Sequence, residues 1–193
     1  MEKLPFFLLC AVSLLLGSEL SSEAQTKKPE TPAGRSDNKS KIVALNTNEL
    51  EALPYDAGKV KFIVSSEETN GAWAVVELTE MPGYKTTWHR HNDLEEAYYV
   101  VEGVWTVKIA DKTYEFPAGS YALIPRGMPH GQGNFTDKPV RLLLTVTPGG
   151  LEQFFKERVE LFKTMKPDQP EFRERLTELR RKYTDIVSQT WEK

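Results

Sequence analysis

The sequence predicts an all-β protein with two α-helices at its C-terminus, and two observations carry this prediction. Between residues 59 and 147 the chain reads as roughly eight or nine short strand candidates separated by turn-forming residues, which is typical of a β-sandwich or barrel. After the turn at residues 148–150 the hydrophobic period changes to that of a helix.

Composition indicates one globular domain with appendages. The chain has 193 residues, of which 39% are hydrophobic and 27% charged, as expected of a soluble protein with a real core. The net charge of -3 gives no basis for nucleic-acid binding. The one cysteine, Cys10, excludes an intramolecular disulfide framework.

Residues 1–24 have the three parts of a secretory signal peptide. Lys3 precedes an almost continuous apolar run at residues 4–16, and Ser22 and Ala24 are the small residues before a cleavage point at Gln25. The run is shorter than the roughly 20 residues of a membrane span, and an uncleaved anchor is the alternative. We therefore expect a secreted or periplasmic protein without a membrane span after cleavage. Residues 25–41 lack large apolar side chains and are expected to form a flexible linker.

The strand candidates begin with the apolar run at residues 42–45, which we expect to form the first ordered strand; residues 50–55 stay unassigned. Further along, Trp105, Val107 and Ile109 alternate with more polar residues, as in a half-buried strand. Asp111 and Lys112 are expected to turn this strand into the next one.

Two helices are expected after residue 150. Leu151, Phe154, Phe155, Val159 and Phe162 fall at helical intervals. The second helix is expected to begin near Pro170, because proline is favoured in the first helical turn. Its apolar side is marked by Phe172, Leu176, Leu179, Tyr183 and Ile186. These apolar stripes indicate packing against the β-domain, with a dimer contact as the alternative. The charged residues between positions 171 and 182 are expected to face solvent.

All three histidines of the chain lie in one stretch, at His89, His91 and His130. His89 and His91 are two residues apart in an extended segment, so both imidazoles are expected on one face of a strand. A carboxylate five residues later and the third histidine would complete three nitrogens and one oxygen. This set suits a divalent transition metal such as Fe, Mn, Ni, Cu or Zn.

Two glycine-bounded patterns surround these ligands. The first runs Gly, five residues, His-x-His, four residues, Glu, six residues, Gly, and is formed by Gly83, His89, His91, Glu96 and Gly103. The glycines stand where tight turns need φ freedom.

The second pattern runs Gly, five residues, Pro-x-Gly, two residues, His, three residues, Asn. It is formed by Gly119, Pro125, Gly127, His130 and Asn134. We expect the Pro125–Gly127 turn to aim His130 back at the other two histidines, and Asn134 to be structural.

These two patterns resemble the two motifs of the cupin superfamily, and residues 147–155 are similar to the end of quercetin-dioxygenase-like single-domain cupins. The resemblance, which extends to secreted germin-like proteins, implies a double-stranded β-helix, or jelly-roll, barrel. The resemblance covers about residues 60–148. Together with the hydrophobic patterns it leads us to expect a cupin domain at residues 42–150, with its motifs at 83–134, and a helical extension at 151–193.

Two adjacent glutamates compete for the fourth ligand position. Glu96 is favoured because Gly103 follows at the motif's spacing, whereas Glu95 is expected to point to the other face of the strand. By the same alternation, Arg90 is expected to point away from the metal. Arg126 is expected to be a solvated loop residue, with contact to an anionic substrate as the alternative.

The resemblance implies a metal-dependent dioxygenase acting on a small aromatic or enolic substrate. In this reading Glu96 binds the metal and also takes the substrate proton, as the catalytic base. A non-catalytic binding module for a carbohydrate or other small molecule and a non-oxidative isomerase or lyase remain alternatives, because one fold hosts many functions. A homodimer is a further expectation. No phosphate loop, basic groove or Ser-His-Asp arrangement favours another class.

Aromatic and methionine residues near the motifs are candidates for the substrate pocket, with a place in the barrel core as the alternative. They are Trp88, Tyr98, Trp105, Tyr121, Met128 and Phe135.

Overall fold

The computed structural model describes residues 40–193. The predicted signal peptide at 1–24 and residues 25–39 of the predicted linker lie outside the described residues. In the part of the chain that is described, no helix has both the length and the apolar character needed to cross a membrane.

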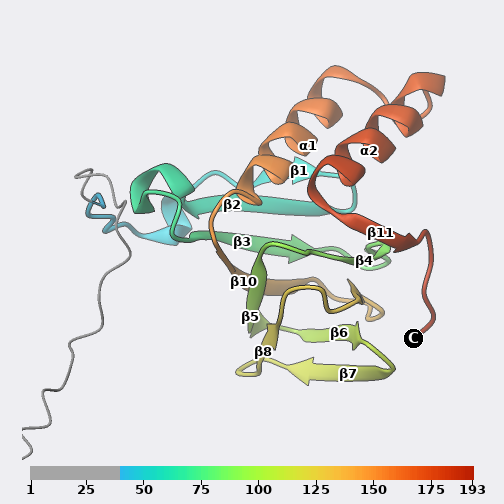
Figure 1. The fold of residues 1–193 in the computed structure, drawn as a ribbon, viewed down its shortest axis with the longest axis horizontal. Helices are drawn as coiled ribbons and strands as arrows, with labels where there is room; N and C mark the ends of the chain where they lie inside the picture. Colours follow the sequence, from blue (N-terminus) through green and yellow to red (C-terminus); the bar gives the residue numbers. More distant parts are fainter. Residues whose placement is uncertain (1–39) are drawn as a thin grey trace, which may run out of the picture. The chain divides into compact units, whose positions relative to one another are not determined.

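Two antiparallel sheets form a sandwich (Figure 1). The six-stranded sheet has the order β1 (Leu53–Tyr55), β2 (Gly58–Val64), β3 (Ala74–Glu80), β10 (Val140–Thr147), β5 (Glu95–Glu102) and β8 (Tyr121–Ile124). The five-stranded sheet has the order β11 (Asp185–Ser188), β4 (Trp88–Arg90), β9 (His130–Gly133), β6 (Val104–Ile109) and β7 (Lys112–Pro117). Short 3-10 turns at Thr47–Glu49 and Ser66–Thr69 precede and follow the first hairpin.

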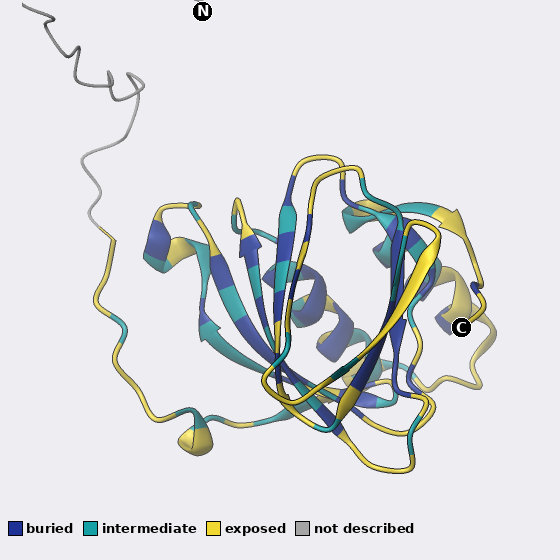
Figure 2. Cartoon of the chain, turned by 90° about the horizontal axis from the view of Figure 1, so that it is seen from below, coloured by how far each residue is buried: buried dark blue, intermediate teal, exposed yellow. Residues whose placement is uncertain are grey.

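The prediction of a β-rich fold with two C-terminal helices is confirmed, but the word barrel is too strong. Within residues 40–193 the two sheets keep separate edges, at β1 and β8 in one and at β11 and β7 in the other. The core lies between the sheets, where buried residues alternate with exposed ones along the strands (Figure 2). Strand β10 shows this alternation over its whole length, with Val140, Leu142, Leu144 and Val146 buried.

The first strand differs from the prediction. Residues 42–45 form no strand, and Ile42 is 96% exposed, because this segment has no neighbouring strand to pair with. The ordered strands instead begin at β1, in the segment left unassigned. Its Tyr55 is fully buried, and a turn at Asp56, with φ of 50°, leads into β2.

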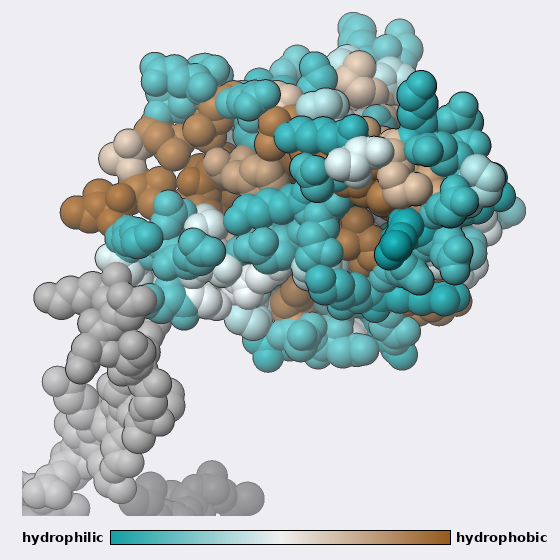
Figure 3. Space-filling model, turned by 90° about the horizontal axis from the view of Figure 1, so that it is seen from above, coloured by the Kyte–Doolittle hydropathy of each residue, from teal (hydrophilic) through white to brown (hydrophobic). Residues whose placement is uncertain are grey.

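Helices α1 (Glu152–Thr164) and α2 (Pro170–Tyr183) cover one side of the six-stranded sheet (Figure 1). The predicted apolar stripe of α1 packs into the main core, as does Leu179 of α2, which favours packing within the chain over a dimer contact. Hydrophilic side chains occupy much of the helix-bearing face seen in Figure 3. Pro170 is the first residue of α2, as predicted.

The end of the chain is not helical, which corrects the predicted helical extension. Helix α2 ends at Tyr183, and Ile186 lies in β11, paired with His89 of β4. The β-branched residues Thr184, Ile186 and Val187 favour this extended conformation. The C-terminal segment therefore adds a strand directly beside the histidine-bearing strand.

Gly103 and Gly119 provide a matched test of the glycine positions. Both have positive φ, of 84° and 90°, as the motifs predicted. A Cβ on Gly103 would lie 2.9 Å from the carbonyl oxygen of Pro139, whereas a Cβ on Gly119 would meet nothing within 4 Å.

We expect Gly103→Ala to lower the free energy of unfolding clearly more than Gly119→Ala does. Each variant bears the strain of a left-handed residue, about 1 to 2 kcal/mol, and only Gly103→Ala adds a backbone clash. Urea denaturation of both variants measures the difference. Equal losses would show that the contact with Pro139 is unimportant.

Candidate metal centre

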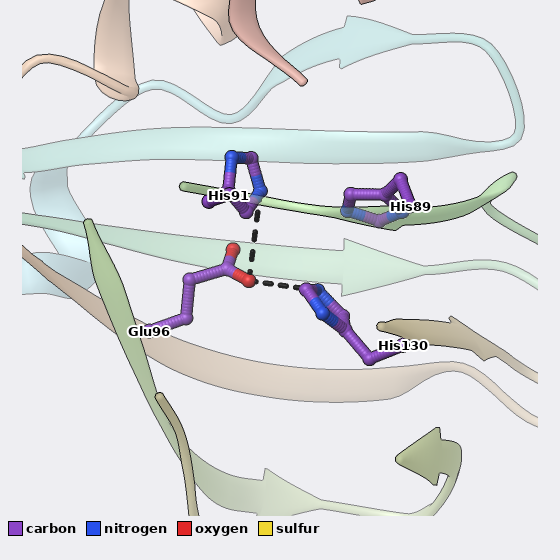
Figure 4. Close-up of side chains that lie close together, drawn as sticks. All are labelled: His89, His91, Glu96 and His130. Atoms are coloured by element: carbon purple, nitrogen blue, oxygen red, sulfur yellow. Dashed lines mark ion pairs between the residues drawn. The ribbon is translucent and has the colours of Figure 1, made fainter. Parts of the chain in front are cut away.

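The four predicted ligands come together between the two sheets (Figure 4). His89 lies on β4 directly opposite His130 of β9, and His91 follows the end of β4. Glu96 projects from β5 of the other sheet. All four side chains are buried. The site thus joins the two layers of the sandwich.

The geometry of the four side chains suits a single small cation. One donor atom from each residue lies within 4.8 Å of the others. Glu96 Oε2 is 2.8 Å from His130 Nε2 and 3.7 Å from His91 Nε2. Metal–ligand bonds of about 2.0–2.2 Å are compatible with donor atoms spaced in this way.

Backbone carbonyls orient all three imidazoles. His89 Nδ1 is 2.9 Å from the oxygen of Thr87, His91 Nδ1 is 3.0 Å from that of Tyr183, and His130 Nδ1 is 3.0 Å from that of Met128. A carbonyl only accepts, so each Nδ1 carries the proton and each Nε2 keeps its lone pair. Histidine ligands of metals are fixed in this way.

Two buried atoms in the site lack the partner that a cation would supply. Glu96 Oε2 and His130 Nε2 lie close together, yet neither makes a hydrogen bond of acceptable geometry. With the His130 proton on Nδ1, two lone pairs face each other at this point. Buried polar atoms without partners are rare, and the donor set therefore fits a divalent metal.

The pKa shifts of His89 and Glu96 also suit metal binding, whereas that of His130 means that a metal must compete with a proton there. Burial, together with the neighbouring His130, lowers the pKa of His89 to about 3, so His89 is neutral. Burial would raise the pKa of Glu96, but His91 and His130 outweigh it and hold this pKa below its ordinary value. Burial would lower the pKa of His130, but the charge of Glu96 outweighs it and raises this pKa.

Tyr98 fixes the second oxygen of the ligand carboxylate. Its hydroxyl donates to Glu96 Oε1 at 3.0 Å, which leaves Oε2 for the histidines and a metal. Burial and the adjacent Glu96 raise the pKa of Tyr98 well above its ordinary value, so Tyr98 stays a donor.

The neighbouring charged residues lie where strand alternation placed them. Glu95 is 3.9 Å from Arg126, at the surface, and Arg90 pairs with Asp185 of β11 at 2.7 Å. Asn134 is structural: its side-chain amide donates to the carbonyl oxygens of Glu80 and Lys138.

A cavity of about 50 Å³ adjoins the centre. Three of the four ligands, His89, His91 and Glu96, line it, together with Tyr98. Much of the remaining wall comes from the C-terminal segment, through Leu151, Phe154, Phe155, Arg158, Arg180 and Thr184.

The predicted pocket residues differ from this lining, because only Tyr98 among them borders the cavity. Trp105 is fully buried in the core, and Met128 packs against the core. Tyr121 and Phe135 are 63% and 42% exposed, and Trp88 lines a separate surface depression with Lys108. Closeness in sequence to a histidine was a poor guide, since neighbouring strand residues face opposite ways.

Sequence reasoning missed the two arginines of the cavity wall. Arg180 belongs to a group of charges expected to face solvent, but it is half-buried. Arg158 lies in α1 among the apolar positions Phe154, Phe155 and Val159 and is 3% exposed. A charge on the apolar stripe of a helix was the signal that could have found it.

Residues 76–146 match the family model described as the cupin domain. An uncharacterized protein of Methanocaldococcus jannaschii is 32% identical over 66 residues, which are 34% of this chain and 53% of that protein. The chain thus spans about half the length of this curated relative.

Solved structures with the same fold include a predicted oxalate decarboxylase from Thermotoga maritima, with a TM-score of 0.50 and 18% identity over 55% of this chain and 98% of that one. An RmlC-like cupin from Shewanella frigidimarina has a TM-score of 0.50 and 19% identity, over 60% and 97% of the two chains. The cupin match thus concerns residues 76–146, and the solved structures share the fold of the chain. At such identities the likeness shows the fold alone, and the cupin fold hosts many activities.

Removing the Tyr98 hydroxyl tests the anchoring of Glu96. We expect Tyr98→Phe to weaken binding of a divalent transition metal by about tenfold or more, because partners of ligand residues contribute this much to affinity. The control is Tyr99→Phe, since Tyr99 is the next residue and is 43% exposed. Competition with a chelator measures both affinities; equal values would refute the anchoring role.

Glu80 gives the protein a distinct pH dependence. It is fully buried, and burial raises its pKa from 4.5 to about 8, although the hydrogen bond from Gln132 opposes this. The unfolded chain loses this proton near pH 4.5 and the folded chain keeps it to about pH 8. The contribution of protonated Glu80 to the free energy of unfolding is therefore present in full below about pH 4.5. It is lost as the pH rises from 4.5 to about 8.

We expect Glu80→Gln to flatten the fall in stability between pH 5 and pH 8, by an amount on the order of 1 kcal/mol per pH unit. Unfolding free energies across this range, with the exposed Glu67→Gln as control, measure the slope. Parallel slopes for wild type and Glu80→Gln would contradict the assignment.

Proposed function

We propose that this cupin binds one divalent transition metal through His89, His91, Glu96 and His130 and is a metal-dependent oxygenase of a small enolic substrate. The observation that carries the proposal is the buried set of three imidazoles, each fixed by a carbonyl at Nδ1, beside a small cavity. A redox-active metal held by these four residues would supply the activation of dioxygen and of an enolate.

Glu96 supplies the acid–base chemistry. It is the one carboxylate among the cavity-lining residues of the described chain, and its low pKa keeps it ionised. It stands where it would take the proton of a substrate in the cavity. The hydroxyl of Tyr98 donates to Glu96 Oε1 and can stabilise the Glu96 side chain both before and after it takes a proton at Oε2.

The size of the cavity restricts the substrate. A volume of about 50 Å³ holds only a few heavy atoms, because one water needs about 10–15 Å³ of cavity volume measured in this way. A flavonoid does not fit while α1 and α2 cover the site. Of the two predicted substrate classes, aromatic and enolic, we therefore favour the enolic one. An outer groove of about 840 Å³ shares His91, Leu151 and Thr184 with the cavity and offers a route of entry.

A non-oxidative lyase or isomerase is the second candidate. The observation that favours it is Glu96 itself, an ionised base beside a small cavity, because proton transfer to or from a substrate needs no oxidant. Dioxygen consumption with small enolisable diketones separates the two candidates.

We also propose that the protein is exported and that it forms a homodimer. Export rests on the signal-like residues 1–24 alone. A homodimer is supported by the edge strand β8, where Tyr121 and Leu123 are exposed beside Tyr99 of β5.

Metal content tests the proposal. We expect the protein from Gln25 onward to hold about one equivalent of Fe, Mn, Ni, Cu or Zn, and His89→Ala and Glu96→Ala to lose nearly all of it. Glu95→Ala is the matched control, because it removes the adjacent, half-buried carboxylate. Elemental mass spectrometry measures all four proteins. Metal retained in Glu96→Ala, or absent from wild type after reconstitution, would refute the site.

A further inference from the structure

The helical wall of the cavity carries a second polar cluster that the metal site does not use. Arg158 of α1 and Arg180 of α2 both line the cavity that His89, His91 and Glu96 also line. The two guanidinium groups reach one small volume from two different helices.

Arg158 is held rigidly and keeps a free donor. One of its terminal nitrogens donates to Asp56 Oδ2 at 2.8 Å. Its guanidinium carbon lies 4.8 Å from the ring centre of Tyr55 and 5.6 Å from that of Phe154. Its Nε is buried and has no hydrogen-bond partner within residues 40–193. A buried donor left unpaired is costly, so an acceptor in the cavity would stabilise it.

Arg180 adds a second positive charge to the cavity wall. Its half-buried guanidinium makes no hydrogen bond or ion pair with any other residue of the described chain. Burial and the nearby Arg158 lower the pKa of Arg180, although Tyr84 and Asp56 oppose this shift. Asp56 makes its ion pair with Arg158, so within residues 40–193 Arg180 has no ion-pair partner of its own.

We propose that the cavity binds a small carboxylate, with its carboxylate group against Arg158 and Arg180 and a neighbouring oxygen facing the His/Glu centre. The contact between the ligand's neighbouring oxygen and the His/Glu centre rests on the proposed function. The inference narrows the substrate class of that function to short oxygenated carboxylates. Planar guanidinium groups match the geometry of a carboxylate and bind it through charge-assisted hydrogen bonds. The volume of about 50 Å³ restricts the ligand to a few heavy atoms.

Glycolate and its neutral isostere glycolamide are the probes, because they differ in charge and hardly in size. We expect the zinc-loaded protein to bind glycolate at least tenfold more tightly than glycolamide in isothermal titration calorimetry. Arg180→Gln should lose this preference, because a hydrogen bond to a charged group contributes about 1.5–3 kcal/mol.

Arg175→Gln is the matched control. It makes the same charge change on the same helix, at an exposed residue whose partner is Glu178 and not the cavity. Arg158→Lys, which keeps the charge and loses the Nε donor, should also weaken glycolate binding.

Two results would overturn the inference: equal affinity of wild type for glycolate and glycolamide, or unchanged glycolate affinity in Arg180→Gln. Zinc titration separates this failure from failure of the metal site. If zinc binds at one equivalent and Arg180→Gln changes nothing, the carboxylate site alone is wrong. If zinc does not bind but the metal-free protein prefers glycolate in an Arg180-dependent way, the metal site alone is wrong.

Discussion

The pairing of β4 with β9 is the constraint on which the candidate site depends. This pairing sets His89 opposite His130, and the short run beyond β4 brings His91 to the same place. The fourth side chain, Glu96, comes from the opposite sheet. A cation held here would therefore bind the two layers of the sandwich together, and its binding energy would add to folding stability.

The C-terminal segment completes the site. Strand β11 pairs with β4, and the carbonyl of Tyr183 orients His91. At the end of the chain the indole of Trp191 donates to the carbonyl of Thr86 and lies so close to Gly131 that no side chain fits there. The segment that follows the matched cupin region thus supplies an orienting carbonyl, part of the cavity wall and both arginines.

Local spacing, together with the resemblance to the two cupin motifs, was enough to predict the four side chains of the centre. A strand alternates its side chains with period two, so His89 and His91 had to share a face, and Glu96 had to differ from Glu95. The helical stripe from Leu151 to Val159 likewise predicted the packing of α1. These features depend on short-range geometry, which a sequence expresses directly.

The sequence predictions that were wrong concern features that depend on contacts between distant segments. The run at residues 42–45 has apolar side chains but no partner strand, and Ile186 fits the helical period but pairs with β4 instead. The cavity lining could not be read from the neighbours of the histidines, because its far wall is built by Arg158 and Arg180, some 28 and 50 residues after His130. Only the folded chain brings these residues to the centre.

X-ray absorption spectroscopy of the metal-loaded protein tests the central claim most directly. The account predicts a first shell with three imidazole nitrogens and at least one oxygen at about 2.0–2.2 Å. A spectrum without imidazole scattering, or with fewer than three imidazoles, would contradict it.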